Sequence, residues 1–403
     1  MEHGFANIPL MTRLLCVCVC CVFLAVGACA ASSSPSENGG NAGAGGDGAG
    51  GQSANSAASG GAGGLGGSIN KGGTGGASIG GITASGGGGG GRVNLDAGAA
   101  IDAPLVQGGS GGVAMPMVID THTHFWDSSR PNPRDRSKPI AWPDPGLKQL
   151  YRPILPAEYI TKSKGTGITA TIVVEASGWL EDNQWVLDLA AQSPVIVGFV
   201  GSFGEVIGTN KFDDALKRFA ANPLFRGIRI GSGEVSAALS SSGRLAEFTK
   251  LGDADLAVDT LGVSLSDVAK LAVSVPKLRI VVDHMAGVAA LDPSSGWKKD
   301  IETLAKSAGA PRIYLKLSGL VESAGNPAPV DAARYTAALE HVWQQMGEDH
   351  LLYSSNWPVS ELNAPLGTVA NILNTFLATK SQASREKVFW KNSQAAYKWV
   401  PRK

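Results

Sequence analysis

From residue 114 onward, a short apolar run recurs eight times, and helix-like segments separate the runs. Continuous apolar strands between helices are typical of a parallel sheet that helices cover on both faces. The predicted strands are 117–121, 170–175, 195–200, 227–230, 256–260, 279–283, 313–317 and 351–354. The predicted helices are 181–192, 211–221, 244–251, 264–273, 297–308, 331–346 and 369–378. Eight such units in about 290 residues predict an α/β fold of the (β/α)8 barrel type, with a doubly wound open sheet as the alternative.

Residues 1–28 have the composition of an export signal. Arg13 precedes an apolar core, 14–26, which is shorter than a membrane-spanning helix needs to be. The tetrapeptide Val-Gly-Ala-Cys that ends at Cys29 resembles the lipobox of bacterial lipoproteins. This resemblance implies cleavage before Cys29, lipid attachment to its thiol, and an extracytoplasmic protein that meets the membrane through the lipid alone. An ordinary secreted protein and a short uncleaved anchor are the alternatives.

Residues 29–113 separate this signal from the predicted barrel at 114–403. The stretch from 30 to 113 holds 31 of the 54 glycines, mixed with Ser, Ala and Asn. Such a composition buries too little apolar surface to offset the entropy of an ordered chain. We therefore expect a disordered tether.

Cysteine usage and charge exclude several classes of function. All five cysteines lie within the first 29 residues, so the predicted mature domain has neither a disulfide nor a thiolate nucleophile or metal ligand. The net charge is zero and the chain has no basic run, which argues against a nucleic-acid partner.

The first predicted strand ends in His122-Thr123-His124. Side chains two positions apart on a strand point to the same face, so we expect His122 and His124 to project together. Neutral imidazoles placed in this way can bind a transition metal or orient a substrate. A lone His-x-His is a weak signal, and two polar residues in a loop are the alternative.

Polar residues also follow the other predicted strands. In a (β/α)8 barrel the active site lies at the carboxyl ends of the strands. The residues at those ends are Glu175, Arg229, Asp259, Asp283, His284, Lys316, Ser318 and Asn356. Two alternatives remain open: Glu175, Arg229 and Asp259 could form a structural ion-pair network around the barrel mouth, and Lys316 could point outward between strand and helix.

Four segments carry a resemblance to a known family: 119–127 (IDTHTHFWD), 226–229 (RGIR), 280–287 (IVVDHMAG) and 352–359 (LYSSNWPV). They resemble the amidohydrolase-related (amidohydrolase 2) family, and within it the fuconolactonases and 2-pyrone-4,6-dicarboxylate lactonases. The resemblance extends from residue 117 to about 400. It implies a distorted TIM barrel that opens a small cyclic ester, a sugar or pyrone-type lactone, by water attack at the barrel mouth.

Water attack needs a base, together with groups that stabilise the carbonyl oxygen and the leaving oxygen. We expect His122 and His124 to polarise the carbonyl, and His284 to be the best remaining base. Arg229 suits a carboxylate or a sugar hydroxyl. The full set of predicted substrate contacts is Trp126, Glu175, Arg229, Asp259 and Trp357, with core packing as the alternative for each tryptophan.

Asn356 is the main departure from the family pattern. In such lactonases the motif usually reads Gly-Ser-Asp-Trp-Pro, and its carboxylate takes a proton from the attacking water. An amide cannot act as a general base near neutral pH. Two alternatives follow: a metal-dependent decarboxylase of the same superfamily that takes a carboxylate substrate, and a binding protein with impaired catalysis.

The replacement of the usual aspartate by Asn356 also affects whether the site can bind a metal. Three imidazoles can hold zinc in a catalytic site, and His122, His124 and His284 are available. Two-metal amidohydrolases use a strand-four Lys or Glu and a strand-five His, where this chain has Arg229 and Asp259. We therefore expect no obligatory metal, with a divalent ion such as zinc at His122 and His124 as the alternative.

Overall fold

The computed structural model describes residues 117–131, 142–287, 291–292 and 294–402. The predicted signal peptide, the lipidation site Cys29 and the glycine-rich tether lie outside these residues. Within the described ranges, no helix has both the length and the apolar character that a membrane crossing needs.

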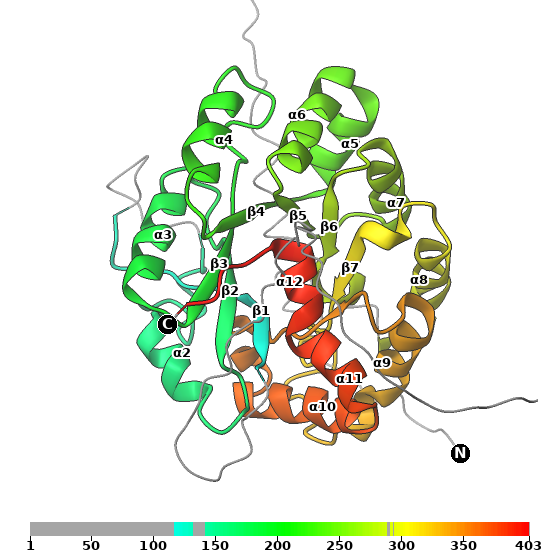
Figure 1. Ribbon diagram of the computed structural model, residues 1–403. Coiled ribbons are helices and arrows are strands. Elements are labelled where there is room, and N and C mark those ends of the chain that lie inside the picture. Colours follow the sequence, from blue (N-terminus) through cyan, green and yellow to red (C-terminus); the bar gives the residue numbers. More distant parts are fainter. Residues whose placement is uncertain (1–116, 132–141, 288–290, 293, 403) are drawn as a thin grey trace, which may run out of the picture. The chain divides into compact units, whose positions relative to one another are not determined.

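Eight parallel strands form one sheet in chain order (Figure 1). They are β1 (Ile119–Thr123), β2 (Ala170–Val174), β3 (Ile196–Gly201), β4 (Phe225–Ile230), β5 (Ala257–Thr260), β6 (Arg279–Val282), β7 (Ile313–Lys316) and β8 (Leu351–Leu352). All eight predicted strands are present. A doubly wound sheet would reverse its strand order at a switch point, so the sequential order rules that alternative out.

The segment after β8 nearly closes the barrel against β1. The backbone N–H of Asn356 donates to the carbonyl of His122, and that of His124 donates to the carbonyl of Trp357, each at 2.9 Å. Thr123 and Trp357 also form an isolated parallel bridge. The result is a TIM-like barrel in which the His-x-His motif lies directly beside Asn356.

The described helices surround the sheet. They are α2 (Pro156–Lys162), α3 (Asp182–Gln192), α4 (Phe212–Ala220), α5 (Ser232–Ser240), α6 (Ser242–Asp253), α7 (Leu265–Ser274), α8 (Trp297–Ala305), α9 (Ala333–Met346), α10 (Leu366–Ala378), α11 (Gln382–Glu386) and α12 (Asn392–Tyr397). The seven predicted helices correspond to α3, α4 and α6 to α10. The sequence analysis missed α2, α5, α11 and α12, which are short or, in α5, made of small residues that give no strong apolar periodicity.

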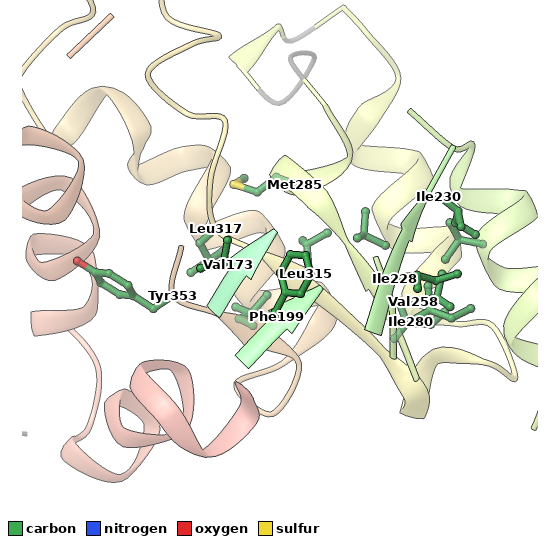
Figure 2. Close-up of a cluster of buried hydrophobic side chains, with 14 of the residues drawn as sticks. Val173, Phe199, Ile228, Ile230, Val258, Ile280, Met285, Leu315, Leu317 and Tyr353 are labelled. Carbon is green, nitrogen blue, oxygen red and sulfur yellow. The ribbon is translucent and has the colours of Figure 1, made fainter. Parts of the chain in front are cut away.

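Two hydrophobic clusters stabilise the barrel. Figure 2 shows part of the larger one, in which Val173, Phe199, Ile228 and Val258 pack between the sheet and the helices. A smaller cluster gathers residues from strands all around the barrel, including Ile172 of β2, and therefore fills the interior. Ile172 and Val173 belong to different clusters because successive side chains of a strand point to opposite faces.

The C-terminal helix closes the amino-terminal end of the barrel. Tyr397 and Trp399 belong to the interior cluster. Arg226 of β4 donates to the carbonyl of Tyr397 at 2.7 Å, and Arg279, the first residue of β6, donates to the carbonyl of Ala396 at 2.6 Å. In Figure 1, α12 (red) crosses in front of the strands. The opposite end, where the strands finish, is the end that carries the polar residues.

Candidate active site

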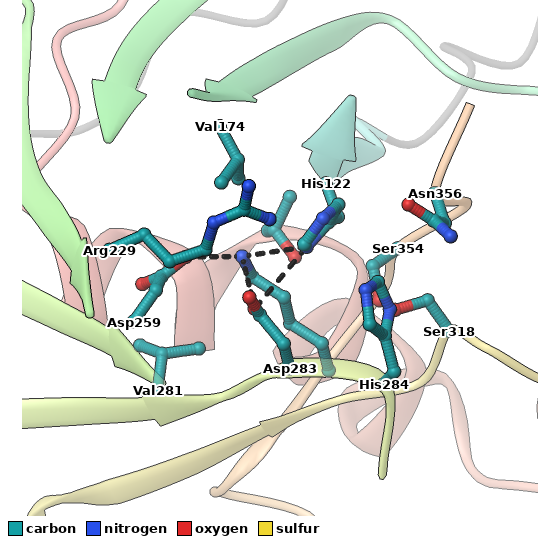
Figure 3. A network of polar contacts seen from close by, with 12 residues as sticks. His122, Val174, Arg229, Asp259, Val281, Asp283, His284, Ser318, Ser354 and Asn356 are labelled. Carbon is teal, nitrogen blue, oxygen red and sulfur yellow. Dashed lines mark hydrogen bonds and ion pairs between the residues drawn. The ribbon is translucent and has the colours of Figure 1, made fainter. Parts of the chain in front are cut away.

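A buried polar layer lies above the apolar interior of the barrel. Along β5, β6 and β7, an interior apolar residue is followed two positions later by Asp259, Asp283 and Lys316. Strand alternation therefore directs all three side chains inward. All three are almost completely buried, as are His122 and Arg229. Figure 3 shows Asp259, Asp283, His122 and Arg229 gathered in this layer.

Lys316 lies at the centre of this layer. Its ammonium donates to Asp259 Oδ2 at 2.5 Å and lies 3.0 Å from Asp283 Oδ1 and 3.1 Å from His122 Nδ1. The other oxygen of Asp259 accepts from the Tyr397 hydroxyl at 2.8 Å. The alternative of an outward-pointing Lys316 is therefore wrong, because the register of β7 turns this side chain into the barrel.

The pKa values of the two carboxyl groups beside Lys316 shift in opposite directions. Burial raises the pKa of Asp259, even though Lys316 and Tyr397 donate to it. Burial also acts on Asp283, but the neighbouring Lys316 and His122 outweigh it and hold the pKa of Asp283 well below its usual range. Asp283 is thus ionised at neutral pH, and Asp259, whose pKa is about 6, is mostly ionised there as well.

The two motif histidines meet as predicted. Their Nε2 atoms lie 3.1 Å apart. His124 Nδ1 donates to the carbonyl of Val174 at 2.9 Å, so Nε2 of the neutral ring carries the lone pair that faces His122. Burial lowers the pKa of His124 to about 3 and that of His122 well below its usual range, so both rings are neutral near pH 7.

The proton on His122 decides what this pair can do. Its Nδ1 lies between a donor, Lys316, and an acceptor, Asp283 Oδ1 at 3.3 Å. If Lys316 donates to Nδ1, then Nε2 carries the proton and donates to His124. If Nδ1 donates to Asp283, two Nε2 lone pairs converge on one point, which suits a metal ion.

His284 reaches the mouth through a sharp turn after β6. Consecutive residues of a strand point to opposite faces, so Asp283 and His284 could not both face the site on a regular strand. His284 has φ 53° and Met285 has φ 51°, both in the left-handed region. This turn brings the His284 ring to 4.5 Å from that of His122, measured between centroids.

The loop after β7 holds His284 in place. Ser318 Oγ lies 3.0 Å from His284 Nδ1. Gly319 has φ +77°, and a Cβ added to it would lie 2.7 Å from the Cβ of His284, so a side chain does not fit there. Burial lowers the pKa of His284 to about 4, which makes this ring a weak base.

Asn356 contacts an acid that the sequence analysis missed. Its Nδ2 donates to Glu322 Oε1 at 2.7 Å. Glu322 lies in an irregular loop beyond β7, where no periodicity marks it, but it is the only charged residue between 317 and 330. Burial raises the pKa of Glu322 to about 7.

Arg229 and Glu175 form an ion pair at the mouth. Arg229 Nε donates to Glu175 Oε1 at 2.8 Å, and Nη2 donates to the Glu175 carbonyl at 2.9 Å. Asp259 instead pairs with Lys316. The ion-pair alternative therefore describes the contact between Arg229 and Glu175 but not that of Asp259, and substrate contact by all three residues stays a prediction.

The two predicted tryptophan contacts lie in the core. Trp126 is 4% exposed and its Nε1 donates to the carbonyl of Leu150. Trp357 is fully buried, and its ring packs against Phe125 and Tyr159, with centroids 6.0 and 5.2 Å away. Both side chains are buried, as the core-packing alternative expects, and substrate contact by either ring stays a prediction.

Asp120, which the sequence analysis did not single out, positions the motif. Its carboxylate accepts from the backbone N–H of His122, from the N–H and hydroxyl of Ser355, and from the Tyr159 hydroxyl, at 2.5 to 3.2 Å. Burial nevertheless raises the pKa of Asp120 to about 6. These bonds fix β1 against the segment after β8, and so fix His122 relative to Asn356.

The described side chains fit a divalent metal. His122, Asp283 and His284 each offer one ligand atom, and these atoms lie within 4.8 Å of one another. His124 Nε2 lies 3.1 Å from His122 Nε2, and its part in a metal site stays a prediction. Asp283 Oδ2 has no hydrogen-bond partner among the described residues. Imidazoles with one carboxylate match the preferences of zinc, and Asp283 and His284 extend the pair that the sequence predicted.

A TIM-like barrel with a histidine-rich polar layer at its carboxyl mouth is the architecture of the amidohydrolase superfamily. Residues 119–399 match the amidohydrolase family, and the chain belongs to it, as the sequence motifs predicted. It is a hydrolase of this superfamily. Two curated relatives are L-fucono-1,5-lactonases. The one from Burkholderia ambifaria is 30% identical over 268 residues, covering 63% of this chain and 84% of the relative. The one from Burkholderia multivorans is 24% identical over 291 residues, covering 69% and 94%.

Solved structures share the fold. An amidohydrolase from Burkholderia multivorans with bound zinc has a TM-score of 0.61 at 23% identity, covering 70% of this chain and 100% of its own. A probable 2-pyrone-4,6-dicarboxylic acid hydrolase from Acinetobacter baumannii, with citric acid bound, has a TM-score of 0.52 at 16% identity, covering 69% and 98%.

Proposed function

We propose that this protein hydrolyses a small cyclic ester, a sugar-acid or pyrone-type lactone, at the carboxyl mouth of the barrel. One observation carries the proposal: three neutral imidazoles, an ionised carboxylate and a buried guanidinium converge at this mouth. The likeness to two L-fucono-1,5-lactonases supports the choice of lactones.

Opening a lactone adds water across the ester C–O bond, and negative charge develops on the carbonyl oxygen. The buried Arg229 guanidinium supplies positive charge for that oxygen. The effect of this charge is stronger in a buried site than in water, because the local dielectric constant is lower. Lys316 keeps Asp283 ionised and fixes it beside His122.

His122, Asp283 and His284 would hold a divalent metal such as zinc. When bound, zinc supplies Lewis-acid polarisation of a carbonyl or acidification of water. The expectation that no metal is obligatory stays a prediction. This prediction is checked by equilibrating the protein with zinc, removing unbound zinc, and then measuring both the bound zinc and the rate of lactone hydrolysis. Turnover that persists without zinc would agree with the expectation, and strict dependence on one equivalent would contradict it.

The function is tested by the release of acid from a panel of sugar-acid 1,5-lactones and 2-pyrone dicarboxylates, with spontaneous hydrolysis subtracted. We expect turnover of at least one lactone, and a loss of about 10²-fold or more in kcat for His124→Ala. His341→Ala is the matched control, because His341 lies on α9 and contacts Lys298 and Trp297 rather than the site. Equal activity in both variants would remove His124 from the mechanism.

Inactivity of the wild type on every lactone would contradict the proposal. Zinc-dependent release of CO₂ from a carboxylate substrate would then indicate the decarboxylase alternative. Binding of a lactone without turnover would indicate the impaired binding protein.

A further inference from the structure

The loop after β7 brings a buried carboxylate to the position where the strand-eight motif lacks one. Asn356 Nδ2 donates to Glu322 Oε1 at 2.7 Å. A carboxylate only accepts, so it fixes the Asn356 amide with its NH₂ toward Glu322 and its carbonyl oxygen turned away. The two side chains therefore act as one unit with a defined orientation.

Two hydrogen-bond acceptors of this unit have no donor among the described residues. Glu322 Oε2 and Asn356 Oδ1 are both buried, and neither has a hydrogen-bond partner in the part of the chain that the structure describes. Leaving buried acceptors unsatisfied costs free energy, so such a pair suits a ligand that donates hydrogen bonds. Water and a substrate hydroxyl both have this chemistry.

The unit is tied to the imidazoles from both sides. The backbone N–H of Asn356 donates to the His122 carbonyl at 2.9 Å. The loop that carries Glu322 also carries Ser318 and Gly319, which contact the His284 ring and its Cβ. Figure 3 shows Asn356 on the side of the site where His122, His284 and Ser318 lie.

We propose that Glu322 is the base of this site and that Asn356 positions its carboxylate, an inference that rests on the proposed lactone hydrolysis. Glu322 Oε2 takes a proton from water while the water oxygen bonds to the carbonyl carbon. The ring C–O bond then breaks, and the proton passes to the departing oxygen. Lactone and water give the hydroxy acid, and Glu322 returns to its ionised form.

The ionisation of the two candidate bases favours Glu322 over His284. A general base works best when its pKa lies near the working pH. Burial raises the pKa of Glu322 to about 7 and lowers that of His284 to about 4. His284 therefore fits better as a hydrogen-bonding group or metal ligand than as the base.

The test compares four full-length proteins on a lactone that the wild type hydrolyses: wild type, Glu322→Gln, Asn356→Asp, and the double variant that combines both changes. Glu322→Gln should lower kcat by about 10²-fold or more, with KM within about threefold, and should abolish the rise in kcat around pH 7. The double variant exchanges the positions of the carboxylate and the amide within the hydrogen-bonded pair. Its kcat should be at least about tenfold higher than that of Glu322→Gln. Glu340→Gln, on the exposed side of α9 in an ion pair with Lys380, is the matched control.

Glu322→Gln with kcat within about threefold of wild type, or with the rise around pH 7 intact, would overturn the inference while leaving the proposed function standing. If Glu322→Gln does not fold, as the absence of a cooperative unfolding transition would show, the pH profile of Asn356→Asp tests the inference instead. Two carboxylates in contact titrate as a pair, so this variant must displace the rise in kcat, and an unmoved rise overturns the inference. A wild type that is inert on every lactone overturns the proposed function, and the inference with it.

Discussion

Replacing Glu322 by glutamine should stabilise the folded protein above pH 7. The glutamine keeps an acceptor for Asn356 Nδ2 and removes a carboxyl group whose ionised form is disfavoured by burial. In the unfolded chain a glutamate titrates near its ordinary pKa of 4.5, whereas burial raises the pKa of Glu322 to about 7 in the folded protein. Between these two values the folded state binds more protons, so the free energy of unfolding falls as the pH rises.

The size of the effect follows from the same two values. One unit of pKa difference corresponds to about 1.4 kcal/mol. Glu322 should therefore lower the unfolding free energy of the wild type by about 1 kcal/mol at pH 5 and by about 3 kcal/mol at pH 8. Glu322→Gln should not be destabilised in this way, because glutamine does not titrate. The variant is therefore expected to exceed the wild type by about 3 kcal/mol in unfolding free energy at pH 8, and by about 1 kcal/mol at pH 5. A catalytic carboxylate that lowers stability is a common trade-off.

Urea unfolding of both proteins at several pH values between 5 and 8 measures this difference directly. Glu340→Gln controls for the loss of a carboxylate that lies outside the site. A Glu322→Gln protein that is no more stable than the wild type at pH 8, or a difference that does not change with pH, would refute the reasoning. It would mean that the Glu322 carboxylate is solvated or compensated in the folded state.

Three further predictions concern other parts of the chain. Lys316→Met should lower the free energy of unfolding by about 3–5 kcal/mol in urea titrations near neutral pH, because it leaves buried carboxylates without their cation, and an effect under 1 kcal/mol would contradict this. Gly319→Ala should cost more stability and more turnover than Gly347→Ala, because both glycines have φ +77° but only the first would place its Cβ against His284; equal effects would remove that contact from the argument. The proposed lipid attachment predicts that the wild type fractionates with membranes and that Cys29→Ala does not, and equal membrane fractions for the two proteins would exclude the anchor.

The barrel could be predicted because its strands are buried on both faces. Each strand is then an apolar run bounded by polar or turn residues, which a single sequence reveals. The helices that escaped prediction lack such a signal. Ser, Gly and Ala make up six of the nine residues of α5, and α11 and α12 have five and six residues. Their positions depend on tertiary packing, as the contact of Tyr397 with the interior cluster shows.

The directions of the site residues could be predicted where these residues lie on regular strands. Strand alternation alone places Asp259 and Lys316 inside the barrel, and a firmer use of it would have settled the direction of Lys316 from the sequence. His122 faces inward only because the register of β1 shifts between Asp120 and Thr123, since Ile119, three positions earlier, already faces the interior. The turn at His284 was not predictable, because three successive non-glycine residues with positive φ follow no local preference. The burial of Trp357 depends on rings from distant parts of the chain, and these contacts leave no local pattern.

Asn356 and Glu322 are best understood as one arrangement. Asn356 has φ 60°, a conformation that asparagine and aspartate both tolerate, so the backbone would accept the acid of the family pattern. An aspartate there would lie against the Glu322 carboxylate, now 2.7 Å from Nδ2, and two buried carboxylates at that distance cannot both ionise. Asparagine keeps the hydrogen bond and the backbone conformation while leaving one ionisable carboxyl in the unit. A loop glutamate and a strand-eight amide together can therefore do what one strand-eight aspartate does, and the departure from the motif does not by itself imply a loss of function.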